Sequence, residues 1–197
     1  MNRSTIILLS VLGGFVLILL WGIGAYNRLV GLSESTESQW ANVQSAYQRR
    51  ADLIPNLVST VKGYADFEQS TLTDVIEARS KATSVQISAD NLTPEKVAEF
   101  QKAQGELKGA LSRLLVSVER YPDLKANQNF LALQSQLEGT ENRINVERDR
   151  FNEQVRTYNS SVKRIPTSLV AAVGGFEARG YFEAEAEAQD APEVSFE

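Results

Sequence analysis

The 197-residue sequence contains neither histidine nor cysteine, and it has only 5 prolines. These absences exclude Ser-His-Asp and Cys-His nucleophiles, HExxH zinc sites, the Glu-x-x-His ligands of di-iron bundles, and disulfide bonds. No GxxxxGK[ST] or GxGxxG phosphate loop is present. Neighbouring carboxylates at helix-surface spacing are more typical of solvated pairs than of an acid–base dyad; they are Asp66, Glu68, Asp74 and Glu77. We therefore expect no enzymatic activity, no cofactor and no metal.

Basic charge is too scarce to favour nucleic acid. The chain has 20 basic and 25 acidic residues, and six of the acidic ones lie in residues 183–197, which contain no basic residue. Without this tail and Arg3, 19 residues of each sign remain. A balanced body gives no electrostatic reason to bind nucleic acid or anionic lipid head groups. We expect no nucleic-acid partner.

The chain does contain one long uncharged run, from Thr5 to Ala25, between Arg3 and Arg28. An α-helix rises about 1.5 Å per residue, so roughly 20 apolar residues cross a hydrocarbon core of about 30 Å. The run predicts a transmembrane anchor, and a cleaved signal peptide, whose apolar core is usually shorter, is the alternative. The candidate lipid-contacting residues, with two aromatic ones at the interface, are Ile6, Leu12, Phe15, Leu19, Trp21 and Tyr26.

The orientation of this anchor depends on a small charge difference. Arg3 and the α-amine precede the run, whereas only Arg28 follows it closely, before Glu34 and Glu37. The positive-inside rule then predicts a cytoplasmic N-terminus and an exported C-terminal domain.

Helical periodicity begins at Trp40. Apolar residues three and four apart from Trp40 to Ala78 predict one helix with a kink at Pro55, and a complete break at Pro55 is the alternative. Residues 84–91 lose the pattern and are expected to form a loop.

Two further long helices are expected. Thr93 can cap the second, which ends near Tyr121, and Asp123 or Asn127 can cap the third. The third holds its apolar spacing over residues 130–165 and stops at Pro166. A short piece capped by Thr167 or Ser168 then runs to Val173.

These elements predict an all-α fold, in which an N-terminal transmembrane helix precedes an antiparallel long-helix bundle with coiled-coil-like seams. The second helix would return towards the membrane and the third would run outward. We divide the chain into a flank, the membrane helix, the bundle and an acidic tail, at residues 1–4, 5–25, 26–173 and 174–197.

Three asparagines in the third predicted helix recur every seven residues. Asn145, Asn152 and Asn159 each follow a residue of the apolar seam. They predict either a hydrogen-bonded layer that sets register against a neighbouring helix, or a solvated flank of the seam.

Polar residues also gather around Pro55, namely Arg49, Arg50, Asp52 and Asn56. They can form a local set of salt bridges beside a kink, or a contact point between protomers.

The acidic tail is the best candidate for binding a partner. Its acidic residues alternate with apolar ones, as in segments that stay extended until they dock. A disordered solubilising end is the alternative, and the period-two alternation from Phe182 to Ala188 leaves the conformation open. The candidate docking residues are Phe176, Tyr181, Phe182 and Phe196.

Several segments, taken in order, resemble the LemA family of bacterial membrane proteins. They are residues 26–30 (YNRLV), 49–58 (RRADLIPNLV), 61–65 (VKGYA), 121–127 (YPDLKAN), 141–144 (ENRI) and 181–184 (YFEA). Phe67 departs from the family pattern, which has a histidine before the glutamate. The resemblance implies a single-pass protein of the bacterial inner membrane with a helical bundle and no established enzymatic role. Some relatives are linked with magnetosome membranes, and others with membrane proteases and quality control.

We expect a non-enzymatic, membrane-anchored scaffold that organises membrane or membrane-protein assemblies. The third predicted helix outruns the second by about ten residues, and this uncovered apolar face predicts a homo-oligomer. Its contacts would be membrane lipid, through the N-terminal helix, and other membrane proteins. The alternative is an adaptor or regulator that docks its tail on a membrane protease or quality-control enzyme.

Overall fold

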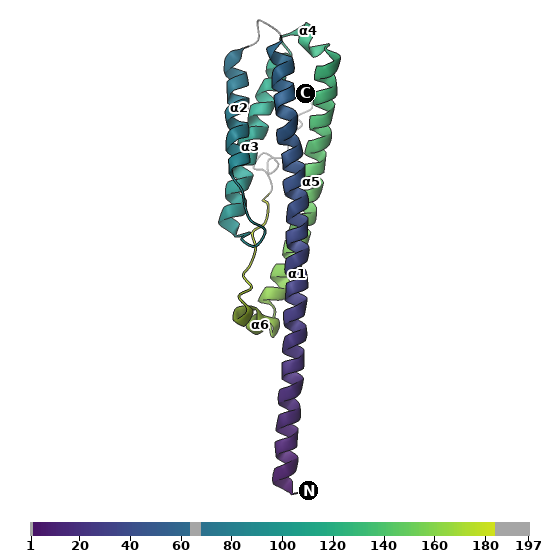
Figure 1. The fold of residues 1–197 in the computed structure, drawn as a ribbon, viewed down its shortest axis with the longest axis vertical. Coiled ribbons are helices and arrows are strands. Elements are labelled where there is room, and N and C mark those ends of the chain that lie inside the picture. Colours follow the sequence, from purple (N-terminus) through teal and green to yellow (C-terminus); the bar gives the residue numbers. More distant parts are fainter. Residues whose placement is uncertain (1, 64–67, 184–197) are drawn as a thin grey trace, which may run out of the picture.

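The computed structural model describes residues 2–63 and 68–183, and these ranges contain helices but no strand. The predicted all-α fold is confirmed. The helices in chain order (Figure 1) are α1 (Arg3–Lys62), α2 (Gln69–Ser84), α3 (Pro94–Val118), α4 (Pro122–Lys125), α5 (Gln128–Lys163) and α6 (Thr167–Gly174).

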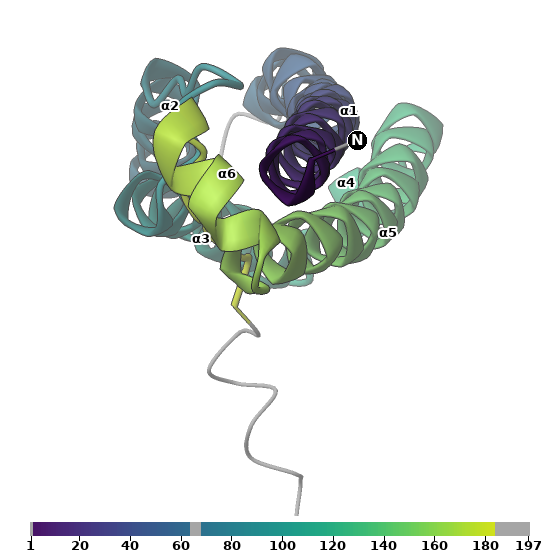
Figure 2. The same cartoon turned by 90° about the horizontal axis from the view of Figure 1, so that it is seen from below.

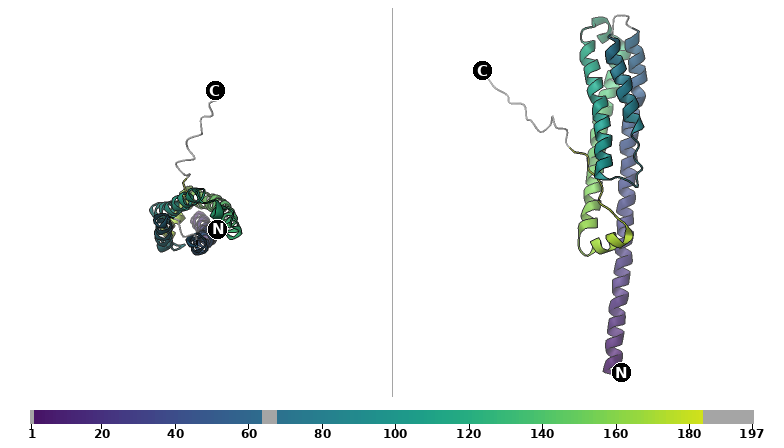
Figure 3. Two further views of the ribbon diagram at one scale, coloured as in Figure 1. Left: turned by 90° about the horizontal axis from the view of Figure 1, so that it is seen from above. Right: turned by 90° about the vertical axis from the view of Figure 1, so that its left-hand side faces the viewer.

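The four long helices form an antiparallel bundle that runs up, down, up and down. Helix α1 leads away from the N-terminal end, α2 returns, α3 leads away again and α5 returns (Figures 1 and 3). Seen from below, the four lie around a common axis, and α4 turns the chain from α3 into α5 (Figure 2).

The expectation of three long helices, with the third running outward, is wrong. The first predicted helix is two helices, because α1 ends at Lys62 and α2 begins at Gln69. Both helices need an apolar stripe that faces the core. The three- and four-residue spacing of apolar residues therefore continues across the turn between α1 and α2, and it gives no sign that the chain reverses direction there. One extra helix inverts the direction of α5, which ends beside the membrane segment.

Helix α1 passes through Pro55 as one helix, as predicted, so the alternative of a complete break there is wrong. Proline removes the N–H that would bond the carbonyl of Ala51. The Nε of Arg79, from α2, donates to that carbonyl at 2.8 Å instead. Because α2 satisfies the orphan acceptor, the helix continues to Lys62.

The N-terminal part of α1 projects beyond the bundle (Figure 1). It is long and apolar enough to cross a membrane, and none of its most apolar stretch is buried. All six candidate lipid-contacting residues are exposed, and the first buried side chain of α1 is Leu29. The helix continues unbroken from this segment into the bundle, which favours the anchor over a cleaved signal peptide.

The buried core consists of two apolar clusters. The cluster at the far end is largely aliphatic and includes Leu57, Leu107 and Leu114, with Phe130 as its buried aromatic residue. The cluster nearer the membrane segment is aromatic and includes Trp40 and Phe151.

The start of each later helix follows the predicted capping pattern in part. Thr93 accepts a hydrogen bond from the backbone N–H of Lys96, and Asn127 accepts one from Phe130. Helix α6 lies where predicted, but no side chain caps it. Because α5 ends at Lys163, Ile165 leaves the apolar seam and is 81% exposed.

Candidate functional site

A buried arginine lies between the two core clusters. The Nη1 of Arg50 is 2.7 Å from the Oε1 of Glu141 on α5, and its Nη2 donates to the side chain of Gln104 on α3 at 2.7 Å. Gln104 in turn donates to the carbonyl of Ala82 at 3.1 Å. These side chains tie α1 to α2, α3 and α5 at one level. This hydrogen-bonded layer is built by residues other than the three asparagines, for which such a layer was one of two alternatives.

The other polar residues around Pro55 do not join Arg50. Asp52 is exposed and accepts from Gln48 on the same helix at 2.7 Å, and Asn56 is also exposed. Arg49 lies in a separate groove between α1 and α5. Arg50 thus lies on the side of α1 that faces the core, whereas the other polar residues around Pro55 lie on the side that faces solvent.

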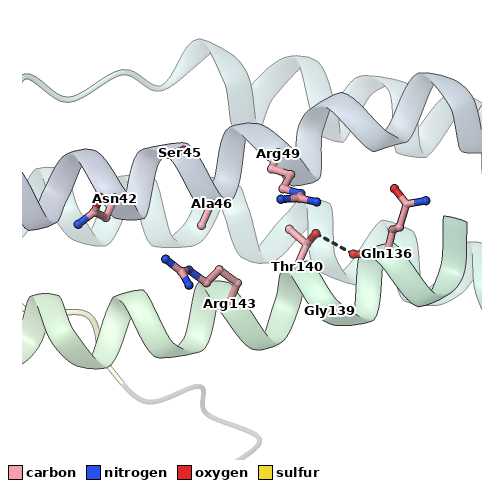
Figure 4. A pocket seen from close by; sticks show the side chains of 8 residues that line it. All are labelled: Asn42, Ser45, Ala46, Arg49, Gln136, Gly139, Thr140 and Arg143. Atoms are coloured by element: carbon pink, nitrogen blue, oxygen red, sulfur yellow. Dashed lines mark hydrogen bonds between the residues drawn. The ribbon is translucent and has the colours of Figure 1, made fainter.

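The groove between α1 and α5 is lined by small residues, among them Ser45, Ala46 and Gly139, and by longer polar or basic ones. Arg49 and Arg143 extend into it from opposite helices, and the hydroxyl of Thr140 donates to the carbonyl of Gln136 at 2.7 Å (Figure 4). None of the described residues that line this groove carries a carboxylate.

The predicted carboxylate group is dispersed in the structure. Glu68 pairs with Arg120 across 3.1 Å at the surface. Asp74 and Glu77 are exposed on α2, and Asp66 lies outside the described residues. Within residues 2–63 and 68–183, no three acidic side chains gather as metal ligands would.

The asparagine stripe holds the tail of its own chain. Asn159 donates to the carbonyl of Arg179 and accepts from its N–H, both at 2.8 Å. Asn152 makes the same pair of bonds with Phe182, at 2.8 and 2.9 Å. A primary amide can satisfy one backbone donor and one acceptor together. The stripe thus acts as a pairing edge for an extended segment.

A third amide continues this pairing from another helix. Gln101 of α3 donates to the carbonyl of Glu183 at 2.9 Å and accepts from its N–H at 3.0 Å. Asn145 does not take part among the described residues. It is exposed and lines a groove together with several basic side chains, including Lys102. We call residues 176–183 the docked segment.

The aromatic side chains of the docked segment differ in burial and in the residues that they contact. Phe182 is buried, with its ring centroid 5.5 Å from Phe151 and 5.9 Å from Trp40. Phe176 packs edge-on against Tyr26 of α1 at 5.4 Å. Tyr181 is 42% exposed. Phe196 lies outside the described residues.

Arg179 fixes the docked segment to α1 and was missed from the sequence. Its guanidinium contacts the carboxylate of Glu37 at 2.6 Å and the hydroxyl of Ser33 at 2.7 Å. It also lies 4.8 Å from the ring centre of Tyr158. Burial raises the pKa of the Tyr158 phenol above its ordinary value, and the positive charge of Arg179 opposes that rise. The available signal was that no other basic residue occurs in residues 174–197.

Two glycines allow the docked segment to approach the bundle. Gly175 has φ of 72°, a left-handed conformation that ends α6. The N–H of Gly180 donates to the carbonyl of Leu92 at 2.8 Å, and a Cβ there would lie 2.7 Å from the Cα of Pro94. Residues 176–183 are therefore part of the fold.

The sequence of the chain is similar to those of several known proteins. The family model described as the LemA family matches residues 39–196. The magnetosome protein MamQ 2 of Paramagnetospirillum magneticum is 27% identical over 189 residues, which cover 86% of this chain and 68% of that protein. MamQ of Magnetospirillum gryphiswaldense is 26% identical with the same coverage.

A relative that carries the family's own name is also similar. Protein LemA of Metamycoplasma hominis is 26% identical over 149 residues, which cover 76% of this chain and 64% of that protein. The family match extends over most of the bundle and the tail, and it agrees with the helical fold. This chain belongs to the LemA family.

Proposed function

We propose that this protein is a non-enzymatic scaffold that holds a rigid helical bundle at the bacterial inner membrane. The observation that carries the proposal is the continuity of α1, a single helix of 60 residues that contains both the apolar segment and the first helix of the bundle. A stiff connection transmits position and orientation, whereas a flexible linker would not.

The similarity to the magnetosome proteins supports a role in membrane organisation. We extend it to this chain as organisation of membrane or membrane-protein assemblies. The exported position of the bundle remains part of the proposal and follows from the flanking charges.

Self-association is a separate part of the proposal, and the structure changes its basis. The part of α5 that was expected to lie uncovered packs against the docked segment, where Tyr158 and Asn159 are buried. The expected excess of apolar surface on α5 is thus used within one chain. A homo-oligomer would need other contacts, such as those between membrane helices.

The test compares two insertions of seven residues after Arg28 in the full-length protein. A Gly/Ser insert makes the connection flexible, and a helical Ala/Glu/Lys insert keeps it stiff and nearly in phase. Assemblies captured by cross-linking in membranes should be lost with the flexible insert and retained with the helical one. Equal assembly with both inserts would contradict the need for a stiff connection, because α1 would then only attach the bundle to the membrane. A strictly monomeric mass at micromolar concentration in detergent would rule out self-association.

The second candidate is an adaptor that presents its acidic end to a membrane enzyme. The exposure of Tyr181 at the surface of the docked segment favours it. Deletion of residues 184–197 tests it without removing Arg179 or Phe182 from the fold. Loss of a co-purifying membrane protein, with assembly of the chain unchanged, would favour the adaptor over the scaffold.

A further inference from the structure

Helix α6 and the turn before it carry an apolar face that no described residue covers. Val173 is 92% and Ile165 81% exposed, the highest values among the large apolar side chains of the described residues, and Leu169 is 68% exposed. Leu169 and Val173 are four residues apart and share one side of the helix. Ala171, on the opposite side, is 1% exposed against the bundle.

This face lies at the level where the apolar segment of α1 ends. Arg164 and Thr167, at the start of α6, line one shallow pocket with Trp21 and Arg28 of α1. Beyond the other end of α6, Phe176 contacts Tyr26. Both ends of α6 therefore lie beside residues 21–28, and α6 crosses the foot of the bundle on the side seen from below (Figures 1 and 2).

We propose that α6 is an interfacial helix that inserts Ile165, Leu169 and Val173 into the bilayer surface. A helix at this level meets the boundary between head groups and acyl chains, where apolar side chains leave water. Exposed basic residues beside it, among them Lys163 and Arg164, have side chains long enough to reach the head groups. The bundle would then contact the membrane at two places, the span and α6.

We assign lipid to the apolar face of α6 because the membrane segment of α1 places the surface of the bilayer at the level of α6. The inference depends on the membrane location of residues 5–25 that the proposed function assumes. A span alone leaves the tilt of the bundle open, whereas a second contact off the axis of α1 restricts it.

The lack of cysteine allows a direct test in the full-length protein. Single variants Val173→Cys and Leu169→Cys carry an environment-sensitive NBD label, and Val116→Cys, 72% exposed on α3, is the matched control. In phosphatidylcholine/phosphatidylglycerol vesicles, labels at 169 and 173 should emit at shorter wavelength than the control. Lipids brominated near the carbonyl should quench them at least threefold more strongly than the control.

Three outcomes would overturn the inference, and Leu12→Cys separates it from the proposed function. Water-like emission at 169 and 173, with quenching at 12, contradicts the role of α6 alone. Water-like emission at 12 as well contradicts the membrane anchor. Shielded emission at 169 and 173 that brominated lipid does not quench, and that disappears when the protein is diluted in lipid, assigns the face to a second copy of the chain.

Discussion

Arg50 has a buried guanidinium whose neighbours come from other helices. It separates a largely aliphatic cluster from an aromatic one, and its contacts with Gln104 and Glu141 form at one register of α1, α3 and α5. A charge that is paired and hydrogen-bonded in one arrangement disfavours every shifted arrangement, because a shift leaves it buried and unpaired. At the scale of the residue, we infer that the contacts of Arg50 favour one register of α1 against α3 and α5.

The first prediction concerns the carboxylate that pairs with Arg50. Glu141→Ala leaves a guanidinium that is 2% exposed without its counter-charge. We expect a loss of about 3 kcal/mol in the free energy of unfolding. The measurement is denaturant unfolding in detergent, followed by circular dichroism.

The control for this prediction lies on α5, and the rescue removes the arginine on α1 together with its carboxylate partner on α5. Glu138→Ala removes an exposed carboxylate three residues away and should change stability by less than about 0.5 kcal/mol. Arg50→Leu combined with Glu141→Ala should recover part of the loss, because no buried charge remains. If the double variant is as unstable as the sum of the two single variants, the pairing is not what stabilises the layer.

At the scale of the element, residues 176–183 form an extended segment that has no neighbouring strand. Side-chain amides of Asn152, Asn159 and Gln101 take the place of a strand's backbone, and Phe182 fills the aromatic cluster. The docking of the tail on a partner stays a prediction, whereas residues 179–183 bond to amide side chains of their own chain. A partner that used Phe182 would first have to remove it from the core.

The second prediction is that two asparagines control the opening of this segment. Asn152→Ala and Asn159→Ala each remove two hydrogen bonds, worth about 1 kcal/mol apiece. Hydrogen exchange at the N–H groups of Phe182 and Arg179 should accelerate about 30-fold, as expected for about 2 kcal/mol. Asn145→Ala, in the same stripe, is the control and should leave both rates unchanged. Equal acceleration in all three variants would contradict a specific role for the pairing.

The sequence predicted helices where their ends carry a local signal. Caps at Thr93 and Asn127 and the stop at Pro166 placed α3, α5 and α6. The reversal between α1 and α2 had no such signal, since the apolar spacing runs through it. The seven-residue repeat of asparagines could be seen in the sequence, but its binding partner could not. An amide that bonds to backbone groups requires no particular residue type in the segment that it binds. Gln101, Gln104 and Arg179 were missed because their roles depend on helices and segments distant in the chain.

At the scale of the molecule, α1 is a single rod shared by the apolar segment and the bundle. From Ala25 to Lys62 it rises about 55 Å at 1.5 Å per residue. The turn containing α4 lies at the end of the bundle away from the N-terminus (Figure 1). If α1 stands upright in a membrane, α4 marks the height of the bundle above it.

The third prediction measures this height. A donor dye on Ala126→Cys, beside α4, and an acceptor lipid in the membrane should report a separation of about 55 Å. A donor on Glu34→Cys, near the membrane segment, should report about 15 Å as the reference. A separation below about 20 Å at residue 126 would mean that the bundle lies on the membrane.

The continuity of α1 also fixes an angle about its own axis. Leu29, Thr36 and Val43 are buried at seven-residue intervals on the side that faces the bundle. Because an α-helix drifts by about 20° over seven residues, Gly22 points within about 20° of the direction of Leu29, and Phe15 within about 40°. A membrane helix that packs against Phe15 therefore lies at a fixed angle about the axis of α1 relative to the bundle. A single residue inserted between Phe15 and Gly22 would rotate Phe15 about the helix axis by about 100° relative to the bundle. The contacts in the bundle core would stay the same.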